Sequence, residues 1–318
     1  MKEYTFLYTS DLHGSDLCFK KAIDTAIHYK VGALLIGGDV AGKSLTFVVR
    51  KAGGFYEALV AGKKERARSG TELEEMREAI ANSGSYSIVL SEEEYECVAN
   101  DEDWNNQQIL SAITKRFNQW LWLAELKLKP HSIRLIIICG NDDPWVLDKA
   151  TRHSSFAENP EYQEVIIGDY HEVLGESGGN LPSPFFCPRD MEEDKLEERI
   201  RGKLAKLKNI GQAVFMLHVP PYNTNLDLAN ELDQEMRVKT KGMSVLQQHV
   251  GSKTVRKIIE EQQPLIALHG HIHESNNTTN IGRTLCFNPG SDHHHGLMRG
   301  FLITLDRDQV RSHAPIQG

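Results

Sequence analysis

Long apolar runs are missing from this sequence of 318 residues. No stretch approaches the roughly 18 consecutive apolar residues that a membrane-spanning helix needs. The first residues, MKEYTFLYTSDLHG, follow a strand pattern instead of the pattern of a signal peptide. We therefore expect a cytoplasmic protein without a membrane partner. The hydrophobic fraction of 40% is high enough for a folded core.

Thiolate pairs and an excess of basic residues are also missing. The five cysteines are scattered and form no C-x-x-C pair, which argues against a zinc or redox site built on thiolates. The net charge of −8 offers no basic face to a nucleic-acid backbone and disfavours binding to long duplexes. A small anionic substrate remains compatible with this charge, because a bound metal ion reverses the potential locally.

Five apolar runs predict buried strands with helices between most of them. They cover residues 4–9, 33–37, 134–139, 213–217 and 265–268. Apolar strands that alternate with helices indicate a sheet covered on both faces, and hence an α/β fold. Two later runs, 284–287 and 300–305, have no helix between them, and we expect antiparallel closing strands there.

One segment, residues 43–129, interrupts this alternation. It is rich in Glu, Lys, Arg and Ala, and its apolar side chains recur at helical spacing: Ile109, Ile113, Phe117, Trp120 and Ala124. We interpret the chain as one domain, residues 1–318, with a helical insertion over 43–129. Its tryptophans could form a cofactor or partner surface, but such stripes usually pack as core. Packing against a second copy of the chain would make the insertion the contact of a homo-oligomer.

Each of the five predicted strands is followed by side chains of the metal-ligand type. In chain order they are Asp11 and His13, then Asp39, then Asn141 and Asp142, then His218, and finally His271 and His273. A single Asp or Asn after a strand is more often a turn former or a helix cap, and a lone His is more often a surface or core residue. Their joint occurrence favours a functional site, since functional groups in α/β sheets collect beyond the carboxyl ends of the strands.

The chemistry of this set suits metal ions. Oxygen and nitrogen donors without thiolates fit Mn, Fe, Zn, Co or Ni better than they fit a structural zinc site. Seven of these side chains, all except Asp142, count as protein ligands, which exceeds what one ion uses. Two divalent ions at roughly 3.5–4 Å could share a bridging carboxylate and clamp a phosphate during in-line attack.

The same residues carry a resemblance to a known family. Asp11-x-His13, Gly38-Asp39, Gly140-Asn141, His218 and Gly270-His271-x-His273, in this order, resemble the signature of the calcineurin-like metallophosphoesterases. The resemblance extends from Tyr4 to about Leu305, apart from the insertion. The turn Asn288-Pro-Gly-Ser291 is similar to that of small bacterial and archaeal members. The resemblance implies a four-layer α/β/β/α sandwich.

The resemblance also implies a role for each residue. One ion would be held by Asp11, His13 and His273, the second by Asn141, His218 and His271, with Asp39 as the bridge and a metal-bound hydroxide as the nucleophile. Candidate catalytic residues are Asp39, Asn141, Asp142 and His218. His269 lies outside the motif, and we interpret it as structural.

Asp142 departs from the family pattern. Many members carry a histidine at this position, directly after the asparagine, to stabilise or protonate the leaving oxygen. Asp142 could orient a ligand or the attacking water, act as a general acid if its pKa were raised, or cap the helix that starts at Asp143-Pro144. We favour capping or orientation over proton transfer. His294 or His295 could supply the proton instead.

These features favour hydrolysis of small phosphate esters. The run from Asp39 to Lys43 lacks the arginine that protein phosphatases carry after the bridging Asp, so a phosphoprotein substrate fits poorly. Without an evident acid, diesters with good leaving groups are favoured, and a phosphomonoesterase or a nucleotide pyrophosphatase is the alternative within this chemistry. Outside this chemistry, the chain could be a non-catalytic interaction scaffold of the same fold, or a nuclease, which the acidic balance disfavours.

Overall fold

The fold is mixed α/β and contains two six-stranded sheets. The structure is a computed structural model that describes residues 3–60, 62–181, 187–242 and 244–318. The first sheet has the order β22-β21-β1-β2-β7-β8, and the second the order β19-β20-β18-β13-β10-β9. The first comprises β1 (Tyr4–Thr9), β2 (Ala33–Gly37), β7 (Arg134–Ile138), β8 (Ala157–Glu158), β21 (Arg299–Leu305) and β22 (Val310–Gln317). The second comprises β9 (Ile166–Ile167), β10 (His171–Glu176), β13 (Val214–Leu217), β18 (Ile266–Leu268), β19 (Asn277–Ile281) and β20 (Thr284–Asn288).

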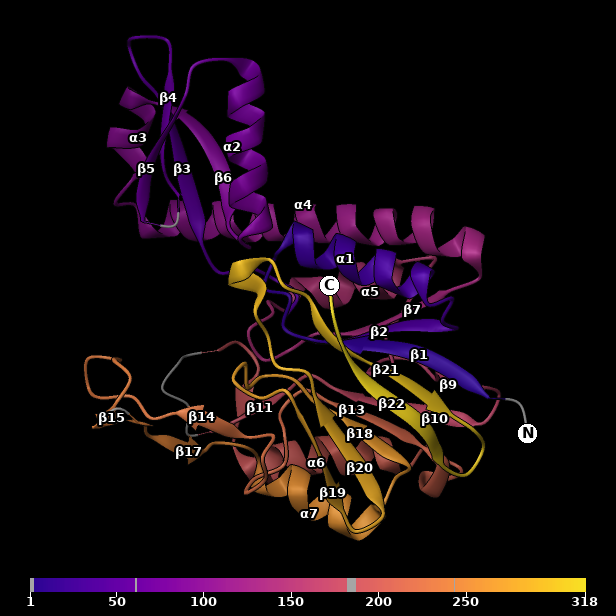
Figure 1. Cartoon of the computed structure of the whole chain (residues 1–318). Coiled ribbons are helices and arrows are strands. Elements are labelled where there is room, and N and C mark those ends of the chain that lie inside the picture. Colours follow the sequence, from indigo (N-terminus) through magenta and orange to yellow (C-terminus); the bar gives the residue numbers. More distant parts are fainter. Residues whose placement is uncertain (1–2, 61, 182–186, 243) are drawn as a thin grey trace.

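Helices lie beside both sheets, as Figure 1 shows. Helices α1 (Asp16–His28), α4 (Glu102–Leu128) and α5 (Val146–His153) accompany the first sheet. Helices α6 (Glu193–Leu204) and α7 (Lys253–Gln262) accompany the second. Side chains alternate along each strand, so Leu34 and Ile36 of β2 join the core with α1 and α4, whereas Leu35 joins the core shared by the two sheets.

All five predicted strands are present and run parallel to their neighbours among them. The later runs behave differently from each other. Strand β21 pairs antiparallel with β1, as predicted, but β20 pairs parallel with β18. Along its other edge β20 does pair antiparallel, with the preceding strand β19, so the expectation holds there and fails only for the pairing with β18. The sequence of β19, NTTNI, is too polar to predict a strand.

The insertion, residues 43–129, is not wholly helical: the prediction was wrong for the strands within residues 45–67 and 86–91, and right for the helix between them. This part holds a four-stranded sheet in the order β5-β4-β3-β6, which Figure 1 shows beside α2 and α3. Its elements are β3 (Leu45–Arg50), β4 (Tyr56–Val60), β5 (Lys63–Ala67), α2 (Gly70–Asn82), β6 (Tyr86–Ser91) and α3 (Glu92–Val98). Charged strands such as KKERA, exposed at four of five residues, resemble a solvated helix in composition.

Helix α4 confirms the helical part of the prediction. Ile113, Phe117, Trp120 and Ala124 are all buried. The Trp120 ring stacks on Phe19 of α1 with ring centroids 4.3 Å apart, and its Nε1 donates to Asp16. Trp122 is 65% exposed, so the tryptophans do not form one packed group.

Short elements complete the described chain. They are the 3-10 helices η1 (Lys129–His131), η2 (Ile210–Gln212) and η3 (His293–His295), and the strand pairs β11 (Gly179–Asn180) with β12 (Asp190–Met191), β14 (Leu228–Asn230) with β17 (Gln247–His249), and β15 (Thr240–Lys241) with β16 (Ser244–Val245). Within the described ranges, no helix has the length and apolar character needed to cross a membrane.

Candidate metal centre

The predicted site residues come together at the carboxyl ends of strands from both sheets. Four of the predicted ligands follow strands β1, β2 and β7 of the first sheet: Asp11, His13, Asp39 and Asn141. The other three follow β13 and β18 of the second sheet: His218, His271 and His273. Apart from His271 and His273, which are partly exposed, these side chains are buried. Folding therefore gathers at one place side chains that are up to 262 positions apart in the sequence.

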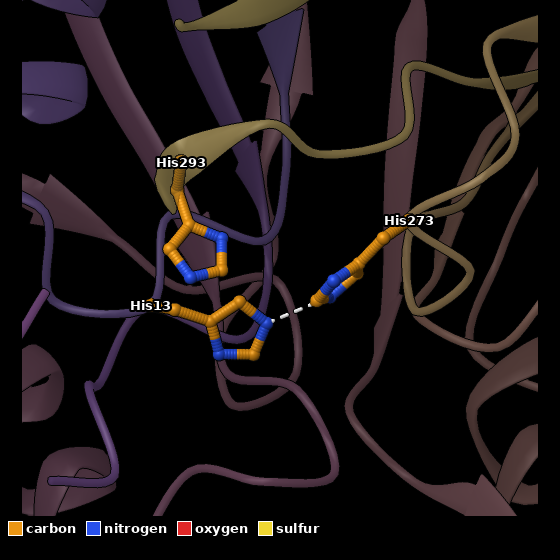
Figure 2. A group of neighbouring side chains, drawn as sticks. All are labelled: His13, His273 and His293. Carbon is orange, nitrogen blue, oxygen red and sulfur yellow. Dashed lines mark hydrogen bonds between the residues drawn. The ribbon is translucent and has the colours of Figure 1, made fainter. Parts of the chain in front are cut away.

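A first group contains Asp11, His13 and His273. The Nε2 atoms of His13 and His273 are 2.9 Å apart, and a dashed line in Figure 2 marks this contact. The Oδ1 atom of Asp11 lies 3.6 Å from Nε2 of His273 and 4.0 Å from Nε2 of His13. Two nitrogens bound at right angles to one ion at about 2.1 Å are about 3.0 Å apart, so the two imidazoles already have a spacing that suits a shared cation.

A second group contains Asn141, His218 and His271. The Oδ1 atom of Asn141 lies 3.1 Å from Nε2 of His218 and 2.9 Å from Nδ1 of His271. Its amide nitrogen donates to Oδ1 of Asp190 at 2.9 Å, which turns the amide oxygen toward the two histidines. These contacts place one oxygen and two nitrogens close enough to share a ligand.

Asp39 lies between the two groups. Its Oδ2 is 3.8 Å from Nε2 of His13, and its Oδ1 is 3.4 Å from Nε2 of His218. Each carboxylate oxygen therefore faces a different group. This is the position that a bridging carboxylate needs.

The donor set fits divalent cations. Among the residues that the structure describes, three overlapping sets of side chains could hold a metal ion: Asp11 with His13 and Asp39, Asp39 with His218 and His271, and His13 with His273 and His293. The Nδ1 atom of His218 donates to the carbonyl of Gly37 at 2.9 Å, so Nε2 is the nitrogen that faces the other donors. A fixed tautomer of this kind is typical of histidines that bind metal.

Burial and mutual charge shift the pKa values of Asp39 and His218. Burial raises the pKa of the Asp39 carboxyl to about 7, although the neighbouring His218 lowers it. Burial lowers the pKa of His218, but the charge of Asp39 outweighs it and raises this pKa to about 10. The pair thus binds a proton where a cation would satisfy the same carboxylate.

The backbone at four of these residues is strained. Asp11, His13, Asp39 and His271 have φ angles of 56°, 42°, 48° and 68°, in the left-handed region. Residues other than glycine rarely adopt this backbone conformation, which costs on the order of 1 kcal/mol or more per residue. Such strain clusters at functional sites, where the surrounding structure holds it in place.

Asp142 is held as a carboxylate and caps no helix. It forms an ion pair with Lys43 and accepts a hydrogen bond from Sγ of Cys187 at 2.8 Å. Burial alone raises the pKa of Asp142, but the charge of Lys43 and the bond from Cys187 lower it to about 2. The capping interpretation of Asp142 was wrong. Instead, the neighbouring Asp143 accepts bonds from three backbone N–H groups, those of Val40, Ala41 and Gly140.

The other histidines differ in position. His269 is buried, and its Nδ1 donates to the carbonyl of Leu217 at 2.8 Å, in agreement with a structural role. His294 and His295 are exposed. His293, which the strand-end pattern does not select, joins His13 and His273, as Figure 2 shows. The only signal for it in the sequence is the run of three histidines after Ser291.

Comparisons with known proteins give a fold and a distant relative. No protein-family model matches the chain. An uncharacterised protein of Methanocaldococcus jannaschii, MJ1162, is 36% identical over 114 residues. The match covers 35% of this chain and 45% of that protein, so this chain spans less than half of the relative's length.

Solved structures resemble the chain over nearly its whole length. The crystal structure of TT1561 from Thermus thermophilus matches with a TM-score of 0.52 and 13% identity, covering 96% of this chain and 99% of that one. This likeness shows a shared fold. A predicted phosphoesterase from Streptococcus pneumoniae TIGR4 matches with a TM-score of 0.33 and 12% identity over 100% of this chain and 99% of that one.

Proposed function

We propose that this chain is a calcineurin-like metallophosphoesterase that hydrolyses small phosphodiesters with the help of two divalent ions. The observation that carries the proposal is the position of Asp39, with one carboxylate oxygen toward each of two groups of ligand-type side chains. The two sheets and the helices beside them support a four-layer α/β/β/α sandwich as the full architecture. The ions would be Mn, Fe, Zn, Co or Ni.

The residues divide the task between them. Asp11, His13 and His273 would hold one ion and Asn141, His218 and His271 the other, with Asp39 shared. When bound, such ions lower the pKa of water and neutralise charge on a phosphate. Asp190 would keep the oxygen of Asn141 turned toward the site through the bond from the Asn141 amide nitrogen.

The environment of Asp142 supports the preference for diesters. A carboxyl whose pKa is about 2 carries no proton to give at neutral pH. The leaving oxygen must then depart without a proton from Asp142, which favours aryl or other well-stabilised leaving groups. A phosphomonoesterase or a nucleotide pyrophosphatase is the alternative, and its substrates would be hydrolysed faster than diesters in a direct comparison.

The activity test compares the wild type with Asp39→Asn. We expect wild-type protein with added Mn²⁺ to hydrolyse bis(p-nitrophenyl) phosphate. We expect Asp39→Asn to lower kcat/KM by more than about 100-fold. Replacing a residue that only hydrogen-bonds to a metal ligand already lowers activity or metal affinity by about 10- to 100-fold. The exposed Lys20→Ala is the control for surface substitutions. If the wild type stays inactive with every one of the five metals, the chain is better described as an interaction scaffold.

The partners follow from the same proposal. The substrate would be a small phosphate ester, and a single-stranded DNA substrate should remain intact under conditions that cleave the diester. We also propose that α4 contributes to a homo-oligomer, because Leu110, Trp122 and Leu126 of this helix are exposed. Sedimentation of wild type and Trp122→Ala would test that contact.

A further inference from the structure

His293 belongs to the candidate centre by position. Its side chain is 5% exposed and comes from η3, well after the strand ends that deliver the predicted ligands. Its ring centroid lies 4.7 Å from that of His13 and 5.7 Å from that of His273. One nitrogen from each of these three rings lies within 4.8 Å of the others, and Figure 2 shows the rings grouped together.

The neighbouring serine fixes the protonation of this ring. The hydroxyl of Ser291 donates to the main-chain oxygen of Asp11 at 2.6 Å. The same Oγ lies 3.0 Å from Nδ1 of His293. A hydroxyl has one proton, and Ser291 donates it to the main-chain oxygen of Asp11. In the bond between Ser291 and His293, Nδ1 of His293 must therefore be the donor. In the neutral ring, the lone pair is then on Nε2.

The same pattern occurs at His218. There Nδ1 donates to the carbonyl of Gly37, and Nε2 faces the other donors of the site. A hydrogen bond from one ring nitrogen that leaves the other unprotonated is the usual arrangement around a metal-binding histidine. Ser291 thereby links His293 to the backbone of Asp11, the first residue of the site.

We propose that His293 is an additional ligand of the ion held by Asp11, His13 and His273. The inference rests on the proposed function, because it needs a metal ion at that place. With Asp39, this ion would then have five protein ligands, three of them imidazoles. Imidazole suits Zn, Ni, Fe and Cu, whereas Mn prefers oxygen, so this ion should favour the nitrogen-preferring metals.

The test measures metal binding directly and uses His293→Gln with His294→Gln as its matched control. Metal-free protein is titrated with Zn²⁺ and with Mn²⁺ in a calorimeter. We expect His293→Gln to weaken one of the two Zn²⁺ binding steps by at least about tenfold and to weaken Mn²⁺ binding less. The exposed His294→Gln should match the wild type.

A second readout needs no substitution in the protein that is measured. Long-range ¹H–¹⁵N spectra of the wild-type histidine rings report which nitrogens bind Zn²⁺. We expect the Nε2 signal of His293 to shift on addition of Zn²⁺, with the signal assigned in the wild type by through-bond correlation to the His293 backbone. This readout also decides the matter if His293→Gln fails to fold.

The outcomes separate the two proposals. If the wild type binds no metal, the proposed function fails together with this inference. If the wild type binds two ions and His13→Ala weakens one step, while His293→Gln matches His294→Gln and the His293 signal stays unchanged, only the role of His293 is overturned.

Discussion

At the scale of single residues, Lys43 determines the ionisation of Asp142. Lys43 lies four residues after Asp39, and the structure pairs its ammonium group with Asp142. The Asp142 side chain is mostly buried, and burial without a partner would favour the protonated acid. The lysine reverses this preference, so this mostly buried carboxyl is kept ionised.

Lys43→Met should therefore change the pH dependence of hydrolysis. Removing the ammonium group removes the strongest effect that lowers the pKa of Asp142, and this pKa rises because burial persists. Asp142 is then protonated below the raised pKa, so the profile of kcat/KM against pH should gain an inflection on its acidic side. In the wild type, Asp142 stays ionised from about pH 4 upward, well above its pKa of about 2.

The double variant Lys43→Met/Asp142→Asn is the control for this prediction. It lacks the titrating carboxyl and should lack the added inflection. Profiles of identical shape for the wild type and Lys43→Met would show that Lys43 does not control Asp142.

At the scale of elements, α4 joins the insertion to the first sheet. Trp120 takes part in this contact through its stack on Phe19 and its bond to Asp16 in α1. The neighbouring Trp122, two residues further along, points away from the core and is 65% exposed. The two tryptophans thus form a natural pair of a packed and an unpacked residue on the same helix.

Trp120→Ala should destabilise the fold by about 3–5 kcal/mol, the usual cost of removing a buried tryptophan. Trp122→Ala, its matched control at a protein concentration where the chain is monomeric, should change stability by about 0.5 kcal/mol or less, as exposed substitutions do. Urea unfolding followed by circular dichroism measures both. Equal losses for the two variants would contradict the packing described for α4.

The sequence predicted the elements that depend on apolar pattern alone. The strands that deliver the site are mostly apolar, and the side chains that follow them meet as expected because parallel strands end at a common edge. Polar strands such as β5 and β19 lack this apolar pattern. They could not be predicted, because pairing with neighbouring strands and not their own side chains decides their conformation. His293 was missed for a related reason: it follows no strand, and only tertiary packing brings it to His13.

At the scale of the whole molecule, the candidate centre connects the two sheets. Asp11 and His13 follow β1 of the first sheet, whereas His271 and His273 follow β18 of the second. The backbone N–H of His271 donates to Asp11 across this junction at 2.9 Å. An ion bound here would be held by both sheets at once and would resist their separation.

Removal of metal should therefore lower the stability of the whole fold. A ligand that binds only the folded state at 100 times its Kd adds about 2.7 kcal/mol per site. We expect the Tm of Mn²⁺-loaded protein to fall on addition of a chelator, in a single transition. For Asp39→Asn, the difference in Tm between the metal-loaded and the metal-free protein should be smaller than for the wild type. An unchanged wild-type Tm would mean that the ions are not held between the sheets.

The backbone contact between the insertion and His13 has a consequence for engineering. A Cβ on Gly84 would lie 2.3 Å from the carbonyl oxygen of His13, and one on Gly42 would lie 1.9 Å from the carbonyl oxygen of Gly84. Main chain touches main chain here, with no side chain as a spacer. The insertion therefore cannot be removed without consequence for the site. A shortened or transplanted version must preserve this backbone contact, or the loop that carries His13 loses its support.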